Sequence, residues 1–219
     1  MSTVWDKIYK KFLSDKKNYG CLSGEILPAF TEFVKNSNFP VRSAFDIGCG
    51  PGNYLEFLKT EGFKVAGIDS SETAVAMSKA LLGESVDIKL SDMYEYDIPV
   101  GVYDLIYSIL TLHHGTKHQV EGAVKGIFKG LISEGKIFIT LPVYASKQDW
   151  QEGNEWEYIE DGVIMPNSGP EKGLVHSLFR EQEVRDMFED FSQLQISKNE
   201  KKIMWTITAL KNKKSQAHG

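Results

Sequence analysis

The spacing of the apolar residues changes repeatedly along this chain, and this alternation limits the folds that it can adopt. Stretches in which apolar residues recur every three or four positions, as on one face of a helix, alternate with short apolar runs that are typical of buried strands. The strands that we expect before the last part of the chain lie at 41–47, 64–68, 86–90, 103–109 and 135–143. Strands that alternate with helices indicate a parallel sheet with right-handed crossovers. We therefore predict an α/β fold with a doubly wound sheet and helices on both faces.

The last part of the chain departs from this rhythm in two places. The apolar runs at 192–197 and 201–210 are separated by a short polar turn and predict an antiparallel hairpin. Residues 143–176 carry four glycines, two prolines and several aromatic residues, among them Trp150 and Trp156. This stretch is too aromatic for a linker and too broken for a long helix. We predict an insertion that starts at the carboxyl end of the fifth strand and forms an apolar roof there.

Composition and charge disfavour several classes of protein. At 219 residues, with 42% apolar and 25% charged residues, we expect a single domain that spans 1–219. The formal net charge of -5 gives no basic field that would gather nucleic acid. Cys21 and Cys49 are too few for a disulfide framework or a metal cluster, and no apolar stretch resembles a signal peptide or a membrane span. We therefore expect a reduced, cytoplasmic protein that associates with neither nucleic acid nor membrane.

The stretch AFDIGCGPGNYLEFL, residues 44–58, is the most specific motif of the chain. Gly48, Gly50 and Gly52 follow a short apolar strand and precede a helix that we expect to begin near Asn53. Glycine adopts positive φ angles and has no Cβ atom, so a bound group can approach its backbone closely. The start of the helix offers free N–H groups and a positive dipole end to an anionic group. These features suit a nucleotide-like ligand.

The spacing of these glycines does not fit the dinucleotide fingerprint G-x-G-x-x-G in either register. Counted from Gly48, the third glycine would fall at Asn53, and counted from Gly50 it would fall at Leu55. The motif is instead D-x-G-x-G-x-G, with Asp46 at the end of the strand. An acid at this position repels a pyrophosphate and attracts an ammonium or sulfonium group. We therefore expect a ligand with a cationic part, and with a carboxylate for the end of the helix.

Acidic residues also follow the next two strands. Asp69 lies 19 residues after Gly50, where it can accept hydrogen bonds from both hydroxyls of a ribose. Asp92 follows the third strand and can accept from an exocyclic amine, with Met93 packed on a purine. In doubly wound sheets the ligand binds outside the carboxyl ends of the strands. We therefore expect these residues to meet at one site.

The pattern of Asp46, the glycines, Asp69 and Asp92 resembles that of class I S-adenosylmethionine-dependent methyltransferases, of the type that acts on small molecules. The resemblance covers roughly residues 40–141 by motif, together with the terminal hairpin. It implies a Rossmann-like sheet of seven strands, mostly parallel with an antiparallel last strand, and S-adenosyl-L-methionine as the cofactor. The cofactor-binding residues that we expect are Asp46, Gly48, Cys49, Gly50, Gly52, Asp69, Ser70, Asp92, Met93, Ser108 and Leu110.

The resemblance also implies a role for each of these groups. Asp46 would lie near the methionine amino group, Asp69 would bind the ribose, and Asp92 with its neighbour would bind the adenine. The strand end at 108–112 would pass beneath the methionine part of the cofactor. A structural role is the alternative for several of these residues, for example Gly52 as the start of a helix.

Two histidines are candidates for a base that accepts a proton from the methyl acceptor. His113 and His114 follow the fourth strand, and adjacent residues in a turn generally point in different directions. In small-molecule enzymes that this chain resembles, the first histidine of such a pair tends to face the substrate, which favours His113. His176, at the end of the insertion, is the second candidate, and a structural role is the alternative for both. We expect no metal, because the pair and His118 have no carboxylate or cysteine partner at a ligand-like spacing.

The N-terminal segment, residues 1–38, is predicted to form a helical lid. Its first helix has an apolar stripe that includes Trp5 and must be buried, with packing on the sheet as the alternative. We predict that this lid and the 143–176 insertion close over the cleft. Closure would bring Tyr9 or Tyr19, and the histidine of the insertion, near the transferred methyl group.

These observations predict methyl transfer from S-adenosyl-L-methionine to a small-molecule acceptor, by in-line displacement at the sulfonium methyl, in a monomer or homodimer. The main alternative is a non-catalytic regulator or partner protein that binds the same cofactor. A nicotinamide oxidoreductase is disfavoured by Asn53 and Asp46. A nucleic-acid methyltransferase is disfavoured by the net charge and by the lack of an N/D-P-P-Y/F motif after YDLIYS.

Overall fold

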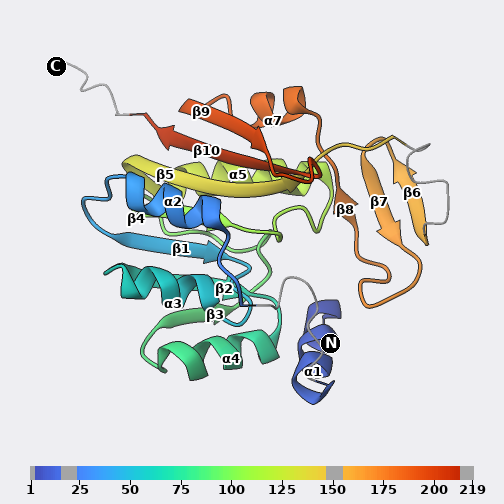
Figure 1. Ribbon diagram of the computed structural model, residues 1–219, viewed down its shortest axis with the longest axis horizontal. Helices are drawn as coiled ribbons and strands as arrows, with labels where there is room; N and C mark the ends of the chain where they lie inside the picture. Colours follow the sequence, from blue (N-terminus) through green and yellow to red (C-terminus); the bar gives the residue numbers. More distant parts are fainter. Residues whose placement is uncertain (1–2, 16–23, 147–154, 213–219) are drawn as a thin grey trace.

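The computed structural model describes residues 3–15, 24–146 and 155–212, and a seven-stranded sheet forms its centre (Figure 1). The strand order is β3-β2-β1-β4-β5-β10-β9, and β10 is antiparallel to both of its neighbours, whereas β1 to β5 are parallel. The strands are β1 (Ser43–Ile47), β2 (Lys64–Asp69), β3 (Asp87–Leu90), β4 (Tyr103–Ser108), β5 (Leu131–Pro142), β9 (Phe191–Lys198) and β10 (Met204–Lys211). The predicted Rossmann-like sheet, mostly parallel with an antiparallel last strand, is confirmed.

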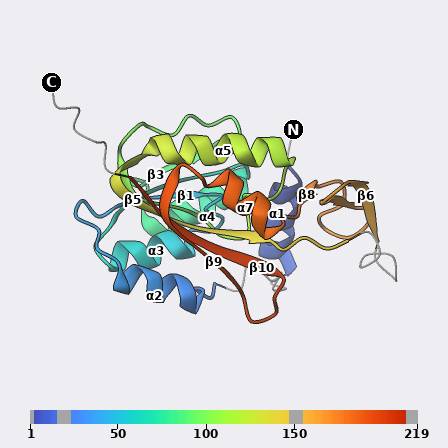
Figure 2. The same ribbon diagram turned by 90° about the horizontal axis from the view of Figure 1, so that it is seen from above.

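Helices cover both faces of this sheet (Figure 2). One face carries α5 (Lys117–Gly130) and α7 (Glu181–Met187), and the other carries α2 (Pro28–Asn36), α3 (Asn53–Thr60) and α4 (Glu72–Leu82). Alternate residues of the central strands belong to different cores: Phe45 packs on the α5 side and Ala44 on the α2 side. Because both faces are buried, the strands read as continuous apolar runs rather than as alternating ones.

Two of these helices, α4 and α5, are capped at their N-termini by polar side chains. The Ser71 hydroxyl accepts a hydrogen bond from the Ala74 backbone N–H at the start of α4. At the start of α5, Thr116 and Gln119 form a capping box, in which each side chain bonds the backbone of the other residue. Such caps satisfy N–H groups that have no partner within the helix. They therefore determine where the loops after β2 and β4 end, and these loops carry site residues.

Part of the 143–176 segment folds into a second, three-stranded antiparallel sheet, which the sequence analysis did not predict. It consists of β6 (Trp156–Glu160), β7 (Val163–Pro166) and β8 (His176–Ser177). The strands are too short for a clear period, and β6 is largely exposed. The signal that could have revealed them is the Asp161–Gly162 pair between β6 and β7, since Asp-Gly is a strong hairpin signal. Trp150 lies outside the described residues.

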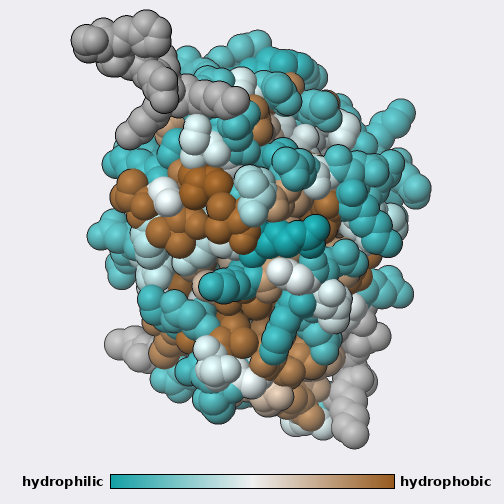
Figure 3. Space-filling view, turned by 90° about the vertical axis from the view of Figure 1, so that its left-hand side faces the viewer, coloured by the Kyte–Doolittle hydropathy of each residue, from teal (hydrophilic) through white to brown (hydrophobic). Residues whose placement is uncertain are grey.

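The second sheet and α1 (Val4–Asp15) both lie at the end of the main sheet toward which β1 points (Figure 1). The opposite end shows apolar patches among hydrophilic residues (Figure 3), and the exposed residues Val41, Val100 and Val102 precede β1 and β4. Within the described part of the chain, no helix is both long enough and apolar enough to cross a membrane.

Candidate functional site

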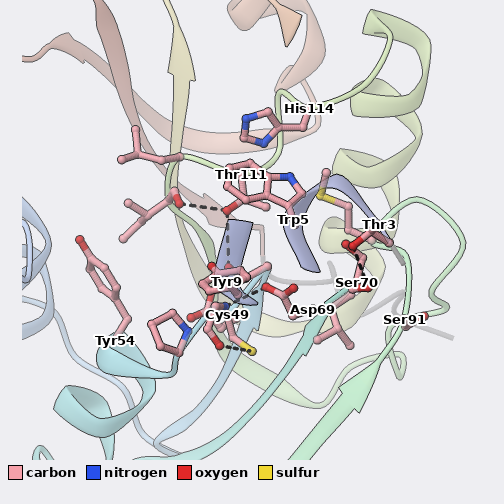
Figure 4. Close-up of a pocket in the computed structure, with 18 of the residues that line it drawn as sticks. Thr3, Trp5, Tyr9, Cys49, Tyr54, Asp69, Ser70, Ser91, Thr111 and His114 are labelled. Atoms are coloured by element: carbon pink, nitrogen blue, oxygen red, sulfur yellow. Dashed lines mark hydrogen bonds between the residues drawn. The ribbon is translucent and has the colours of Figure 1, made fainter. Parts of the chain in front are cut away.

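A cavity of about 270 Å³ lies at the carboxyl ends of the parallel strands. Its walls come from the loops after β1, β2, β3 and β4, and α1 closes one side (Figure 4). The structure therefore brings together, at one site, the strand ends that the sequence placed far apart in the chain. Of the predicted cofactor-binding residues, the lining includes Asp46, Gly48, Cys49, Gly50, Asp69, Ser70, Asp92, Met93 and Leu110.

The loop after β1 is packed so tightly that two of its positions require glycine. Gly48 has a φ of 78°, and a Cβ atom there would overlap the side chain of Thr111 from the loop after β4. Gly50 has a φ of 53°, and its Cβ atom would lie 2.6 Å from the hydroxyl of Tyr9 on α1. The backbone of this loop is thus held between two other segments, with a bare surface toward the cavity.

Gly52, unlike the other two glycines of the motif, does not line the cavity. It precedes α3 as the N-cap with a φ of 92°, and a Cβ atom there would lie 2.6 Å from the Ser78 hydroxyl. That hydroxyl donates a 2.9 Å hydrogen bond to the Gly50 carbonyl. Gly52 therefore allows α4 to support the loop, so its role is the structural alternative noted above.

Cys49 lines the cavity, but its thiol is not a reactive one. The side chain is 6% exposed, and its sulfur lies 3.8 Å from the Ser78 hydroxyl. Burial, together with the nearby Asp46 and Asp69, raises the pKa of the Cys49 thiol well above its ordinary value. The thiol stays protonated at physiological pH and packs as a small apolar group.

Asp69, at the end of β2, joins the loops after β1 and β2. One carboxylate oxygen accepts a 2.9 Å hydrogen bond from the Gly50 N–H, and the other accepts a 2.9 Å bond from the Ser71 N–H. Burial raises the pKa of Asp69, and these backbone N–H groups partly offset that effect. Because an ionised carboxylate has about four acceptor positions, these backbone bonds leave acceptor capacity for a ligand hydroxyl.

Asp46, near the end of β1, is 4% exposed and lines the cavity. Burial raises the pKa of Asp46 well above its ordinary value, and the neighbouring Tyr107 hydroxyl partly offsets this. Among the described residues that line the cavity, Asp46, Asp69, Asp92 and Glu25 are acidic and none is a lysine or an arginine. A cationic group on a ligand would therefore stabilise the ionised form of Asp46.

The remaining predicted cofactor residues differ in their placement. Asp92 accepts a 2.8 Å hydrogen bond from the Tyr94 N–H, and its neighbour Met93 packs partly against the core. Leu110 lines the cavity with a φ of 57°, and its N–H donates a 2.8 Å bond to Thr140. Ser108 is fully buried away from the cavity, where its hydroxyl donates to the Ile47 carbonyl. The strand end thus presents Leu110, not Ser108, to a ligand.

The histidines are arranged differently from our expectation that His113 faces the cleft. His113 is 7% exposed and does not line the cavity, whereas its neighbour His114 does. The reason is the turn after β4, in which the His114 N–H bonds the Thr111 carbonyl and the His113 carbonyl accepts from Ser177 of β8. His176 lies beside them in β8 and is also 7% exposed, away from the lining. His118 is exposed on α5.

Burial keeps the paired histidines in their neutral form. It lowers the pKa of His113 well below its ordinary value, and it lowers the pKa of His114 to about 4. The neighbouring histidines add to both effects. At physiological pH both imidazoles therefore have a lone pair available.

The first helix reaches the cavity through aromatic residues and is anchored by a buried acid. Trp5 and Tyr9 line the cavity, and the Trp5 ring lies 4.9 Å from that of His114 (Figure 4). Asp6 is 2% exposed, and one of its oxygens accepts from the hydroxyls of Ser71 and Thr73 and from the Thr73 N–H. Sequence reasoning missed Asp6, because its partners at the start of α4 are distant in the chain.

Residues 1–38 and 143–176 were both predicted to cover the cleft, but not all of their described residues lie at the cavity. α2 packs its buried residues Phe30 and Val34 on the sheet, so this part of residues 1–38 belongs to the core. From the 143–176 segment, Leu174 lines the cavity. Tyr19 lies outside the described residues.

Known proteins are similar to this chain over its central part. Residues 45–139 match the family model described as a methyltransferase domain. An uncharacterized methyltransferase of Synechocystis is 25% identical over 108 residues, which cover 48% of this chain and 49% of that protein. Trans-aconitate 2-methyltransferase of Delftia acidovorans is 30% identical over 105 residues, 46% of this chain and 38% of that protein. The chain thus matches about half or less of the length of these relatives.

Solved structures share the fold over most of the chain. A SAM-dependent methyltransferase of Methanosarcina mazei superimposes with a TM-score of 0.68 at 16% identity, covering 87% of this chain and 100% of that one. The 1,6-didemethyltoxoflavin-N1-methyltransferase of Burkholderia thailandensis, solved with bound 1,6-didemethyltoxoflavin and S-adenosylhomocysteine, has a TM-score of 0.66 at 17% identity, and the match covers 96% of this chain and 88% of that one. Residues 45–139 thus match a methyltransferase domain, and the order of the strands in the sheet belongs to a fold that this chain shares with solved S-adenosylmethionine-dependent methyltransferases.

Proposed function

We propose that this chain transfers the methyl group of S-adenosyl-L-methionine to a small-molecule acceptor. The observation that carries the proposal is the convergence of Asp46, the Gly48–Gly50 loop, Asp69 and Asp92 on one cavity. Asp46 and the glycine loop come from the end of β1, Asp69 from the end of β2 and Asp92 from the loop after β3, which are the strand ends where ligands bind in sheets of this kind. The small-molecule acceptor is supported by the net charge of -5 and by the partly enclosed cavity.

The residues present fit the cofactor. Asp46 is a buried acid, and the described part of the cavity wall holds no lysine or arginine beside it, which suits the ammonium of the methionine part. The glycine loop leaves bare backbone where a Cβ atom would fill the space between the loop and α1. Asp69 retains acceptor positions for ribose hydroxyls, and Asp92 with Met93 lies at the next strand end, where it suits the adenine.

When bound, S-adenosyl-L-methionine supplies a methyl group that is already activated on a sulfonium. The residues of this chain then have to orient the acceptor, exclude water and accept a proton where the acceptor carries one. Trp5 and Tyr9 cover the glycine loop and exclude water from that side. Their rings also offer π faces to a cationic ligand. Three histidines lie close together beside the cavity, and of these His114 lines it. His114, rather than His113, is therefore within reach of a methyl acceptor.

Ligand-dependent melting tests the cofactor assignment. S-adenosylhomocysteine should raise the melting temperature of the full chain, because a ligand that binds only the folded state stabilises it, whereas NADH should not. A shift with NADH alone would overturn the proposal. Turnover of S-adenosyl-L-methionine on a panel of small molecules then separates an enzyme from the non-catalytic binding protein that the sequence left as the alternative. Tight binding of S-adenosylhomocysteine without methyl transfer to any acceptor would favour the latter.

A further inference from the structure

Three histidines that are distant in the sequence come together beside the cavity. The ring centroids of His113 and His114 lie 4.0 Å apart, and those of His113 and His176 lie 5.4 Å apart. The rings of His114 and His176 are separated by 4.7 Å. One nitrogen from each ring lies within 4.8 Å of a nitrogen from each of the others. We call His113, His114 and His176 the histidine cluster. Its three potential ligand atoms lie close enough together to surround a single ion.

One ring nitrogen of each histidine in this cluster is buried and makes no hydrogen bond to the other two rings. Nδ1 of His113, Nδ1 of His114 and Nε2 of His176 are each inaccessible to solvent and make no hydrogen bond of good geometry among the described residues, although Nε2 of His176 has the Glu171 carboxylate beside it. Buried polar atoms that make no hydrogen bond are rare in native proteins, so three such nitrogens at one place are unusual unless something binds them. His113 and His176 are each only 7% exposed, so bulk water does not solvate them.

A carboxylate stands next to the histidine cluster. Oε2 of Glu171 lies 3.2 Å from Nε2 of His176, and the Glu171 side chain is 19% exposed. Around a tetrahedral Zn²⁺ with bonds of about 2.0–2.1 Å, neighbouring ligand atoms are about 3.3 Å apart. The separation of these two atoms, which is that of an ion pair, is thus also close to the separation of two ligands on one ion.

The backbone around the histidine cluster is held in place by other contacts. The Ser177 N–H donates to the His113 carbonyl at 2.9 Å, and the Ser177 hydroxyl donates to the Gly115 carbonyl at 2.6 Å. These bonds join β8 to the turn after β4. Trp156 lies with its ring 5.1 Å from that of His176, on the side of the second sheet. Ligands on a fixed backbone lose little conformational freedom when an ion binds.

We propose that His113, His114, His176 and Glu171 bind one divalent first-row transition-metal ion, such as Zn²⁺. Imidazole nitrogens with a single carboxylate suit Zn²⁺, Fe²⁺ or Co²⁺, whereas Mg²⁺ and Ca²⁺ prefer sets of oxygen ligands. The histidine nitrogens are within 4.8 Å of one another, so ion binding draws the rings closer together by side-chain rotation. Because His114 also lines the cavity, the ion would lie at the cavity wall.

Histidine binds a metal ion through a neutral imidazole nitrogen, and the three imidazoles are buried or half-buried with one nitrogen of each within 4.8 Å of the others. From the sequence we expected no metal, because the third histidine that we considered beside the His113–His114 pair was His118, which is exposed on α5. The fold supplies instead a third histidine and an acid from the 143–176 segment. These two residues lie about sixty positions along the chain from the pair, and therefore have no recognisable ligand spacing.

Metal titration of the full chain tests this site without measuring turnover. After treatment with EDTA and removal of the chelator, Zn²⁺ titrated by calorimetry should bind at one equivalent per chain. Co²⁺ should give the intense visible bands of a four-coordinate site, without the thiolate-to-cobalt charge-transfer band that Cys21 or Cys49 would produce. An absence of stoichiometric Zn²⁺ and Co²⁺ binding by the wild-type chain would overturn the proposal. So would a spectrum with thiolate bands.

Variants then locate the ion. His113→Ala and His176→Ala should each weaken Zn²⁺ binding by at least about 100-fold, since loss of even a residue that only supports a ligand costs about 10–100-fold. His118→Ala should bind as the wild type does. Should an alanine variant fail to fold, Glu171→Gln provides a milder change, expected to weaken binding by about 10-fold or more. Wild-type affinity in both Glu171→Gln and a folded histidine variant would contradict the assignment.

Discussion

The hydroxyl of Tyr9 on α1 lies 2.6 Å from the position that a Cβ atom on Gly50 would take. The N-terminal helix and the glycine loop are therefore in contact, with no room for a side chain between them. Any ligand that approaches the backbone of this loop does so beside Tyr9 and Trp5, which both line the cavity. Binding at the loop and docking of α1 should consequently be coupled.

Gly50→Ala should weaken binding of S-adenosylhomocysteine by about 10-fold or more. The new methyl group meets the Tyr9 hydroxyl, and the φ of 53° adds about 1–2 kcal/mol of backbone strain. Calorimetry measures the change in affinity. Gly101→Ala is the matched control, since its φ is 66° and no atom lies within 4 Å of its Cβ position. Gly101→Ala should lower the stability of the chain and leave its affinity for S-adenosylhomocysteine unchanged. If both variants bound this ligand equally well, the contact between Gly50 and Tyr9 would not matter for binding.

Asp6→Ala should release α1 from α4. Its carboxylate oxygen accepts three hydrogen bonds from Ser71 and Thr73, and bonds to charged groups contribute about 1.5–3 kcal/mol. Amide exchange within α1 should accelerate by about 10-fold or more, whereas the central strands keep their protection. Lys7→Ala, an exposed change on the same helix, is the control. Unchanged exchange in Asp6→Ala would show that other contacts hold the helix.

Asp46→Asn should stabilise the ligand-free chain and weaken its binding of S-adenosylhomocysteine. Burial raises the pKa of Asp46 in the folded state, so its contribution to stability is fully present below the unfolded pKa and is lost as pH rises through the folded one. Denaturant unfolding at several pH values should show the variant gaining on the wild type as pH rises. Affinity should fall by about 10–100-fold, because the ligand ammonium loses a charged partner. A variant less stable than the wild type at pH 8 would contradict this account.

Asp69→Ala should weaken S-adenosylhomocysteine binding by roughly 2–4 kcal/mol through the lost bonds to the ribose hydroxyls. It also leaves the N–H groups of Gly50 and Ser71 without their acceptor, so part of the loss could come from the loop. A cycle with the 2′-deoxy analogue of the ligand separates the two causes. The wild type should discriminate between the two ligands and the variant should not. Equal discrimination in both proteins would remove Asp69 from the ribose site.

S-adenosylhomocysteine should slow amide exchange in α1 and in the second sheet if both segments close over a bound cofactor. Trp5, Tyr9 and Leu174 line the cavity, and they connect these segments to it. Hydrogen exchange at saturating ligand measures the effect. Protection confined to the glycine loop and the start of α3 would end the lid hypothesis and leave the cofactor assignment intact.

The sequence predicted the main sheet because its strands and helices have local signals. Strands buried on both faces read as continuous apolar runs, and Ser71 and Thr116 mark the starts of the helices that follow. The terminal hairpin was equally visible in the sequence. In the structure, its second strand β10 lies between β5 and β9. Short strands carry weaker signals. β6, β7 and β8 were therefore missed, and with them the placement of His176 in a strand beside the histidine pair.

By itself, the sequence determined the fold class, the glycine loop and the acids at the ends of β1 and β2, because each depends on residues close together in the chain. Only the tertiary structure decided that His114 and not His113 lines the cavity, that Asp6 anchors α1 on α4, and that His176 with Glu171 joins the pair after β4. These contacts join residues separated by tens of positions, and no local period or spacing encodes them. They arise when the sheet brings the carboxyl ends of its strands to one edge and the covering segments pack against that edge.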